Sequence, residues 1–112
     1  MTDWNAYRAN MQKNVKTLAQ LTPNTLKGLQ TLETPLPESR HLDAKTRELI
    51  ALAVAVTTRC DGCIAVHSAA ARKAGANKDE IAEALGVAVA LNAGAALVYS
   101  SRVMEAFEST ES

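Results

Sequence analysis

Apolar residues recur along this chain at spacings of three and four positions, and alternation with a period of two is never sustained. The first spacing places apolar side chains on one face of a helix, whereas alternation would place them on one face of a strand. No segment repeats internally or has low complexity. The pattern therefore predicts an all-α protein, a single-domain helical bundle of five to six helices over residues 1–112.

Two helices are predicted in the first third of the chain. Thr2 is expected to cap a first helix that ends near Leu21. Its apolar face consists of aromatic, aliphatic and thioether side chains at helical spacing: Trp4, Tyr7, Met11, Val15 and Leu18. Pro23 suits the first position of a short second helix. Two further prolines then predict a loop over residues 33–42.

Two more helices, joined by a tight break, are predicted in the middle of the chain. Asp43 is a favoured N-cap for a helix over residues 44–58. This helix is apolar on every side over residues 49–56, so we expect that segment to be buried all round. A break follows at residues 59–62, and a fourth helix then ends directly before Gly75, which suits a helix C-terminus.

The last helix begins at Lys78, because Asn77 and Glu80 have the spacing of a capping box. It is expected to extend to about Phe107, with a bend or restart near residues 92–94. The amide of Asn92 lies in an apolar stretch and needs hydrogen-bond partners. We interpret Asn92 as a helix break or as a core polar group whose hydrogen bonds are satisfied. The more specific functional alternative is that it lines the pocket of a reactive site.

Composition indicates that one copy of the chain is hard to stabilise alone. The sequence has 21 alanines but only 4% aromatic residues, so its apolar side chains are mostly small. Each buried CH₂ contributes roughly 0.8 kcal/mol, and surplus apolar surface usually marks an interface. Small residues in the last helix would let another helix approach closely: Gly86, Ala88, Ala90, Ala93, Gly94, Ala95 and Ala96. We therefore expect a homo-oligomer.

Charge narrows the classes of partner. Twelve basic and twelve acidic residues give a net charge of zero, which argues against a nucleic-acid footprint. The longest apolar run, residues 87–101, is shorter than the ~18 residues of a membrane span and is interrupted by Asn92 and Gly94. The N-terminus is too polar for a secretory signal. We expect a cytoplasmic protein with no membrane or nucleic-acid partner.

Four residues suggest redox chemistry: Glu48, Cys60, Cys63 and His67. The two cysteines form a C-x-x-C, which in a reducing compartment is typical of redox-active or metal sites. Cys63 and His67 are four positions apart, so their Cβ atoms lie ~5–6 Å apart on one helix face. Cys60 lies one turn nearer the N-terminus. Two sulfurs at this spacing can close a disulfide, with the imidazole within reach of the second.

The sequence leaves open which of the two thiols is the more acidic. A helix N-terminus lowers the pKa of a thiol there and favours Cys60 as the thiolate, whereas the imidazole of His67 favours Cys63. Glu48 lies twelve residues before Cys60, on the preceding helix. If these two helices pack as an antiparallel hairpin, its carboxylate can reach the imidazole or a thiol and relay a proton.

Each candidate also has a simpler interpretation. Free cysteines are often small buried hydrophobic residues. The four residues could supply ligands to zinc, although a second Cys or His pair at finger-like spacing is absent. Glu48 alone would be a solvated or capping carboxylate. His41, in the proline-containing loop, is interpreted as a surface residue.

These residues resemble the alkylhydroperoxidase D-like branch of the carboxymuconolactone decarboxylase superfamily. The branch motif is Glu, eleven residues, Cys, two residues, Cys, three residues and His, and this is the spacing from Glu48 to His67. The flanking segments LDAKTRELI and GANKDEIAEAL are also similar. The resemblance covers residues 25–108 approximately and leaves the first helix outside.

The resemblance implies a dithiol peroxidase with an all-α fold. In its terms Cys63 is the peroxidatic thiol that becomes a sulfenic acid, and Cys60 closes the disulfide. Glu48 and His67 form the proton relay. A hydroperoxide and an external dithiol or thiol protein are the implied partners, without a metal or organic cofactor. This chain resembles the single-repeat members of the family, which assemble as hexameric rings, so we expect a hexamer built as a trimer of dimers.

The chain departs from the best-known member of the branch at one place, and two alternatives to the peroxidase function stay open. The best-known member has a His between its cysteines, where this chain has Asp61 and Gly62. An acid there disfavours the thiolate, so we expect low hydroperoxidase rates. A non-catalytic, redox-sensing binding protein would oxidise once without turnover. Lactone decarboxylation ranks lower, because the true lactone decarboxylases of the superfamily lack the cysteine pair.

Overall fold

The computed structural model describes residues 1–110 and confirms the all-α class, because no strand occurs in that part of the chain. Five α-helices are joined by short connections, with one turn of 3₁₀ helix before the third of them. Their bounds are α1 (Trp4–Leu21), α2 (Pro23–Glu33), η1 (Pro37–Ser39), α3 (Ala44–Thr58), α4 (Asp61–Lys73) and α5 (Lys78–Glu108).

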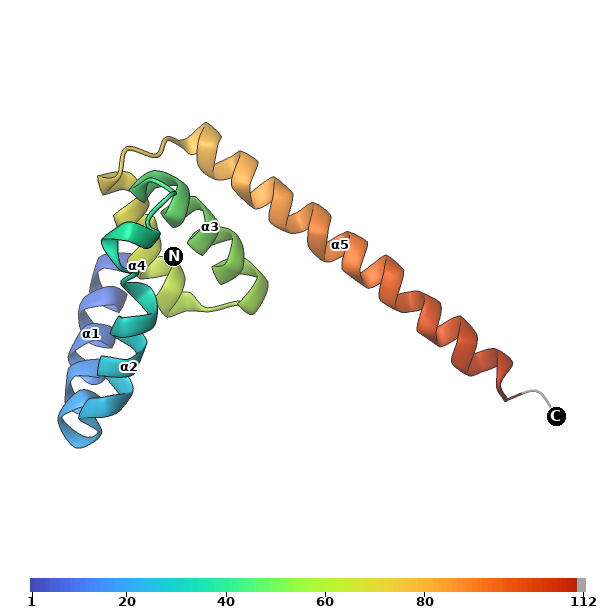
Figure 1. The fold of residues 1–112 in the computed structure, drawn as a ribbon, viewed down its shortest axis with the longest axis horizontal. Helices are drawn as coiled ribbons and strands as arrows, with labels where there is room; N and C mark the ends of the chain where they lie inside the picture. The colour runs from blue at the N-terminus through green and yellow to red at the C-terminus, as the bar shows by residue number, and fades with distance from the viewer. Residues whose placement is uncertain (111–112) are drawn as a thin grey trace.

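The helices form a small body from which one long helix projects. In that body α4 packs against α1 and α3, and α2 packs alongside α1. The first part of α5 contacts α3, and its C-terminal half extends away from the other helices (Figure 1). The radius of gyration is 18.8 Å, against ~13 Å for a compact domain of this length. The single chain is therefore far from globular.

The predicted helix starts are confirmed for α3 and α5 and are one residue early for α1. The Asp43 carboxylate accepts a hydrogen bond from the Thr46 N–H at 2.7 Å. Asn77 and Glu80 complete a reciprocal capping box. At the first helix the cap is Asp3 and not Thr2, because the Asp3 carboxylate accepts from the backbone N–H of the third helical residue.

The chain turns sharply at both ends of α4. Gly75 has a φ of 91°, which a residue without a Cβ adopts at no steric cost, as predicted for a helix end. Arg59 ends α3 in the left-handed region with a φ of 55°. Nothing in the sequence indicated that an arginine would take this position. This turn sets the direction in which α4 returns along α3.

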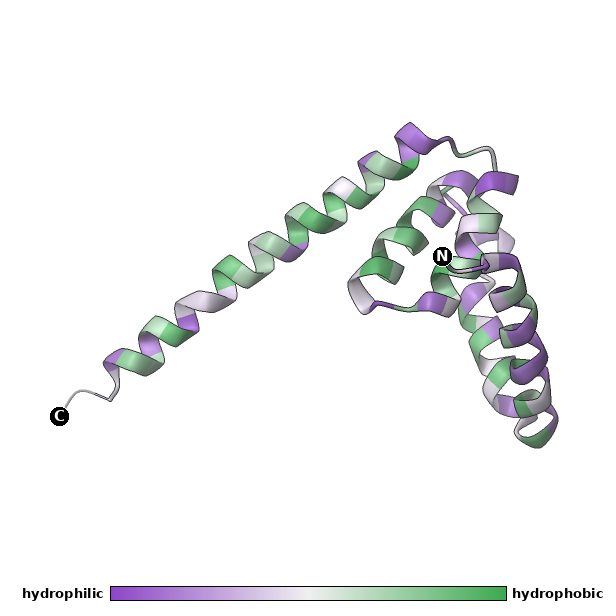
Figure 2. Cartoon of the chain, turned by 180° about the vertical axis from the view of Figure 1, so that it is seen from behind, coloured by the Kyte–Doolittle hydropathy of each residue, from purple (hydrophilic) through white to green (hydrophobic). Residues whose placement is uncertain are grey.

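The expectation that the middle of α3 is buried all round is wrong for the single chain. Buried side chains in the described residues are Leu52, Ala55, Ala65, Ala71 and Ala88. Ile50 and Val54 remain 48% and 54% exposed, because α3 is covered by α4 and α5 and its remaining face is open. Figure 2 shows hydrophobic residues along α3 and along much of α5.

The predicted break in the last helix is also wrong, since α5 is continuous over 31 residues. The Asn92 amide donates to the Ala88 carbonyl at 2.7 Å and to the Thr57 hydroxyl of α3 at 2.9 Å. Its polar group is thereby satisfied without breaking the helix. Asn92 thus helps to join α5 to α3.

The length and hydropathy of α5 also correct the sequence estimate of its apolar run. Residues 84–101 contain no charged side chain, and the helix is long and apolar enough to cross a membrane by length and composition alone. Only 6% of its most apolar window is buried. An apolar helix this exposed requires something to cover it.

Candidate functional site

The geometry of α3 and α4 places a carboxylate against an imidazole. Glu48 lies in the second turn of α3, and His67 lies near the middle of α4. Their Oε2 and Nδ1 atoms are 2.6 Å apart. Both side chains are half-buried, with 23% of Glu48 and 30% of His67 exposed. Residues 19 positions apart in sequence thus form one hydrogen-bonded pair.

The two cysteines lie at the start of α4 and are joined as a disulfide. Cys60 is the N-cap residue, and its Sγ accepts a hydrogen bond from the Cys63 N–H at 3.1 Å. The Cα atoms are 5.2 Å apart, inside the range of about 4.4–6.8 Å that disulfides adopt. The N–H at this helix terminus would also stabilise negative charge on Cys60 when the pair is reduced.

The carboxylate–imidazole pair and the cysteine pair meet on α4, one turn apart. Cys63 and His67 share a helix face, although no hydrogen bond joins the two pairs within residues 1–110. Because Nδ1 of His67 is engaged by Glu48, its Nε2 is the nitrogen left to exchange a proton. A carboxylate that orients an imidazole beside a thiol is an arrangement that activates the sulfur as a nucleophile.

Charges on the helix termini near this site reinforce the packing of α5 on α3. Lys45, in the first turn of α3, forms an ion pair of 2.6 Å with Glu80 in the first turn of α5. The hydrogen bond with Glu80 raises the pKa of Lys45, and the same bond lowers the pKa of the Glu80 carboxyl. Glu48 lies one turn beyond Lys45, so this pair fixes the end of α3 that carries the carboxylate.

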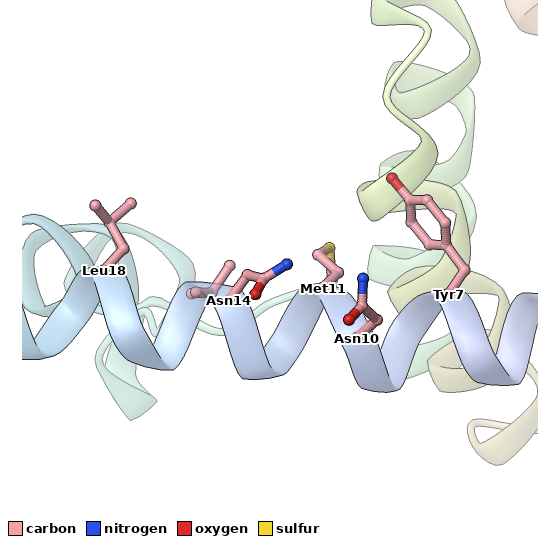
Figure 3. A pocket seen from close by; sticks show the side chains of 6 residues that line it. Tyr7, Asn10, Met11, Asn14 and Leu18 are labelled. Atoms are coloured by element: carbon pink, nitrogen blue, oxygen red, sulfur yellow. The ribbon is translucent and has the colours of Figure 1, made fainter.

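Helix α1 touches the site helix in a way that sequence reasoning missed. Arg8 donates from Nε to the Ala65 carbonyl at 2.8 Å, between Cys63 and His67 in sequence. A β-carbon at position 62 would lie 2.6 Å from the Met11 sulfur, so Gly62 leaves the room that Met11 occupies. Figure 3 shows Met11 on the same side of α1 as two other side chains of its apolar face, Tyr7 and Leu18.

The remaining candidates form no hydrogen bond with the Glu48–His67 pair or with the two cysteines within the described residues. His41 is exposed in the connection between η1 and α3. The hydrogen bonds of Asn92 go to α3 and to its own helix, and not to a cysteine. Within the described residues, no group of three or more His, Cys, Asp or Glu side chains is placed to hold a metal ion.

Comparison with known proteins identifies a related family. The sequence pattern of the "Carboxymuconolactone decarboxylase family" matches residues 23–106. This range contains α2 to α4 and nearly all of α5, and it leaves α1 outside. All four candidate residues lie within it.

One relative extends this likeness to nearly the whole chain, and a second one matches just over half of it. An uncharacterized protein of Haemophilus influenzae is 51% identical over 106 residues, covering 95% of this chain and 94% of its own. An uncharacterized protein of Paracoccus denitrificans, named for its place in a cox locus, is 43% identical over 56% of this chain and 57% of its own.

A solved structure shares the fold as well as the sequence. The crystal structure of an apo carboxymuconolactone decarboxylase family protein from Legionella pneumophila has a TM-score of 0.73 and 33% identity. It covers 95% of both chains, so the likeness includes α1. The overall fold of this chain is therefore shared with an experimental structure.

Proposed function

The chain belongs to the carboxymuconolactone decarboxylase family, and from that premise we propose that it is a thiol-dependent peroxidase or disulfide reductase of the alkylhydroperoxidase D-like branch. The observation that carries the proposal is the 2.6 Å contact between Glu48 and His67, one helical turn from Cys63 in a Cys60–Cys63 disulfide. The family includes alkylhydroperoxidase-like enzymes.

In the proposed cycle Cys63 is the first sulfur to react. Its thiolate attacks the terminal oxygen of a hydroperoxide ROOH, forming an S–O bond as the O–O bond breaks. The departing RO⁻ takes a proton through His67, held by Glu48, and leaves as the alcohol ROH. Cysteine is oxidised by two electrons to the sulfenic acid, and the peroxide is reduced by two.

The second and third steps restore the dithiol. The thiolate of Cys60 attacks the sulfenic sulfur, so that the disulfide forms and hydroxide leaves, taking up a proton to give water. An external dithiol such as dihydrolipoamide then reduces the disulfide by thiol–disulfide exchange and becomes a disulfide itself. Neither a metal nor an organic cofactor enters this cycle.

The residues between the cysteines set the expected rate. Asp61 is in the first turn of α4, where a carboxylate favours the helix. The same negative charge, one residue from Cys60 and two from Cys63, opposes formation of a thiolate. We therefore propose a cytoplasmic peroxidase whose reaction with peroxide is slow.

We also propose that a second copy of the chain covers α5. One chain exposes 9088 Å², whereas a folded monomer of this mass exposes about 6,000 Å². A groove of about 370 Å³ lies where α5 leaves α3, lined chiefly by Ile50, Val54, Val87 and Leu91. Apolar side chains on the free half of another α5 match this groove, and a trimer of dimers would use several such contacts.

The function is tested by steady-state consumption of cumene hydroperoxide with dihydrolipoamide, beside Cys63→Ser and Cys60→Ser. Wild-type protein is expected to turn over repeatedly, and one equivalent of peroxide should remove both titratable thiols together. Cys63→Ser should be inactive, and Cys60→Ser should stop at a sulfenic acid trapped by dimedone. Full peroxide consumption by Cys63→Ser would contradict the proposal, and a single oxidation without turnover would favour a redox sensor.

A further inference from the structure

A cavity beside Glu48 carries two guanidinium groups that have no acidic partner. The connection between α2 and α3, with the first turn of α3, borders an open cavity of about 300 Å³. Arg40 and Arg47 line it together with Glu48. Within residues 1–110 the ion pairs closer than 4.0 Å are Lys45–Glu80 and His67–Glu48, so neither arginine is neutralised by a carboxylate.

Both guanidinium groups are held in place by main-chain oxygens. Arg40 donates from Nε to the Pro35 carbonyl at 3.1 Å, and Arg47 donates from Nη2 to the Glu33 carbonyl at 3.3 Å. Each bond uses one of the five N–H donors of the side chain. The remaining donors form the planar arrangement that binds a carboxylate in bidentate fashion.

The apolar lining and the size of the cavity indicate the rest of the ligand's structure. Pro35, Leu42 and Ala44 supply apolar surface. The cavity is open and has about 300 Å³, the volume of roughly ten water molecules, so it has room for a carboxylate and the ring or short chain that carries it. Two carboxylates also line it, those of Glu33 and Glu48, and both oppose a bound anion. The Glu48 carboxylate is engaged by His67, whereas Glu33 forms no ion pair within the described residues.

We propose that this cavity binds the carboxylate of a compact organic hydroperoxide and so selects acidic substrates for the dithiol. The proposal rests on the peroxidase function proposed above. Glu48 borders the cavity and holds His67, which lies one turn from Cys63. A substrate anchored at Arg40 and Arg47 would therefore extend its peroxide toward the residues that reduce it.

The first experiment compares two substrates that differ by one carboxylate. Cumene hydroperoxide is the neutral member, and its 4-carboxy derivative is the acidic one, with the same peroxide group. Wild-type protein is expected to show a kcat/KM about tenfold higher for the acidic substrate, mostly through a lower KM. Equal kcat/KM values for the two would overturn the proposal.

Charge-removing variants assign that preference to the cavity. The double variant Arg40→Gln/Arg47→Gln should lose the preference, because its kcat/KM should fall more for the acidic substrate than for cumene hydroperoxide. Glu33→Gln should increase the preference, since it removes a like charge. Arg72→Gln, at the exposed end of α4, is the matched control and should change nothing. A double variant that loses both substrates equally would show a structural role and overturn the proposal.

A binding measurement separates this proposal from the peroxidase function. The disulfide form is titrated with 4-(2-hydroxypropan-2-yl)benzoate, the alcohol that the acidic substrate would leave, and amide chemical shifts are followed by NMR. Saturable shifts around Leu42 and Arg47 that the double variant abolishes would support the anion site even if neither peroxide were consumed. Absence of saturable shifts would refute the site, whatever the peroxidase assay gives.

Discussion

At the scale of single residues, the proposed chemistry depends on one side chain that forms no hydrogen bond with either cysteine sulfur within residues 1–110. The Oε2 atom of Glu48 is hydrogen-bonded to Nδ1 of His67 at 2.6 Å. A carboxylate in that place orients the ring and sets its tautomer. The reactivity of Cys63 is therefore expected to depend on a residue of a different helix.

Replacement of this carboxylate by an amide tests that dependence. Glu48→Gln should lower the peroxidase kcat by roughly 10²-fold, the lower end of what proton transfer by a positioned side chain contributes. The disulfide should still form on slow oxidation, because both cysteines remain. The measurement is kcat across a range of pH, for which the profile of the variant should differ in shape from that of wild type.

Glu83→Gln is the matched control, since it removes a carboxylate from the exposed face of α5. Its profile should coincide with that of wild type. An unchanged kcat and pH profile in Glu48→Gln would show that the pair is structural.

The residues of the candidate site could be predicted from sequence because most of their geometry is local. The spacing of Cys60, Cys63 and His67 fixes their shared helix face before any tertiary contact is known. The contacts of Arg8 and Met11 with α4 could not be predicted, because they join positions more than fifty residues apart. Whether the four candidates act in catalysis stays a prediction.

At the scale of helices, the start of α3 depends on one charged cap. The hydrogen bond from the Thr46 N–H to the Asp43 carboxylate, reinforced by the Thr46 hydroxyl and by Lys45, lowers the pKa of Asp43 from 3.8. The unfolded chain binds that proton more readily than the folded chain does. The carboxylate therefore stabilises the fold above the unfolded pKa, and this contribution is lost as the pH falls through the lower folded value.

Asp43→Asn should reduce this acid sensitivity, since asparagine still caps a helix but does not titrate. Melting temperatures followed by circular dichroism between pH 6 and pH 3 should fall more steeply for wild type than for the variant. Asp79→Asn, an exposed aspartate in the first turn of α5, should keep the wild-type slope. Parallel slopes for wild type and Asp43→Asn would contradict the argument.

Helix ends were predicted well where a short side chain bonds its own backbone, as at Asp43 and Asn77. The integrity of α5 was predicted less well. Asn92 suggested a break because the sequence does not show that Thr57, 35 positions earlier, would share its amide. Local capping can be read from sequence, whereas the satisfaction of a mid-helix polar group depends on its neighbours in space.

At the scale of the whole molecule, the surplus apolar surface that composition predicted lies largely on α5, with further exposed apolar side chains on α3, α1 and α2. Leu97, Val98 and Phe107 are 76%, 73% and 68% exposed. Sequence could predict that such a surplus existed but not which face would carry it. The assembly itself remains a prediction.

Light scattering on the reduced protein tests it. At micromolar concentration we expect about six times the 11.9 kDa of one chain, and Leu97→Asp should reduce this mass because a charge would be buried without a partner. Gln30→Asp, at an exposed polar position of α2, is the control and should leave the mass unchanged. A mass near 12 kDa for wild type would refute the assembly.

The disulfide within the first turn of α4 has a consequence for how oxidation is transmitted. Its two Cα atoms, 5.2 Å apart, are at a separation that residues one turn apart in a helix already have, so opening and closing the bond requires little backbone travel. A redox sensor needs oxidised and reduced forms that differ in conformation, so that a partner can distinguish them. A disulfide that closes without rearrangement is poorly suited to signalling and well suited to repeated turnover, which favours a catalyst over a sensor.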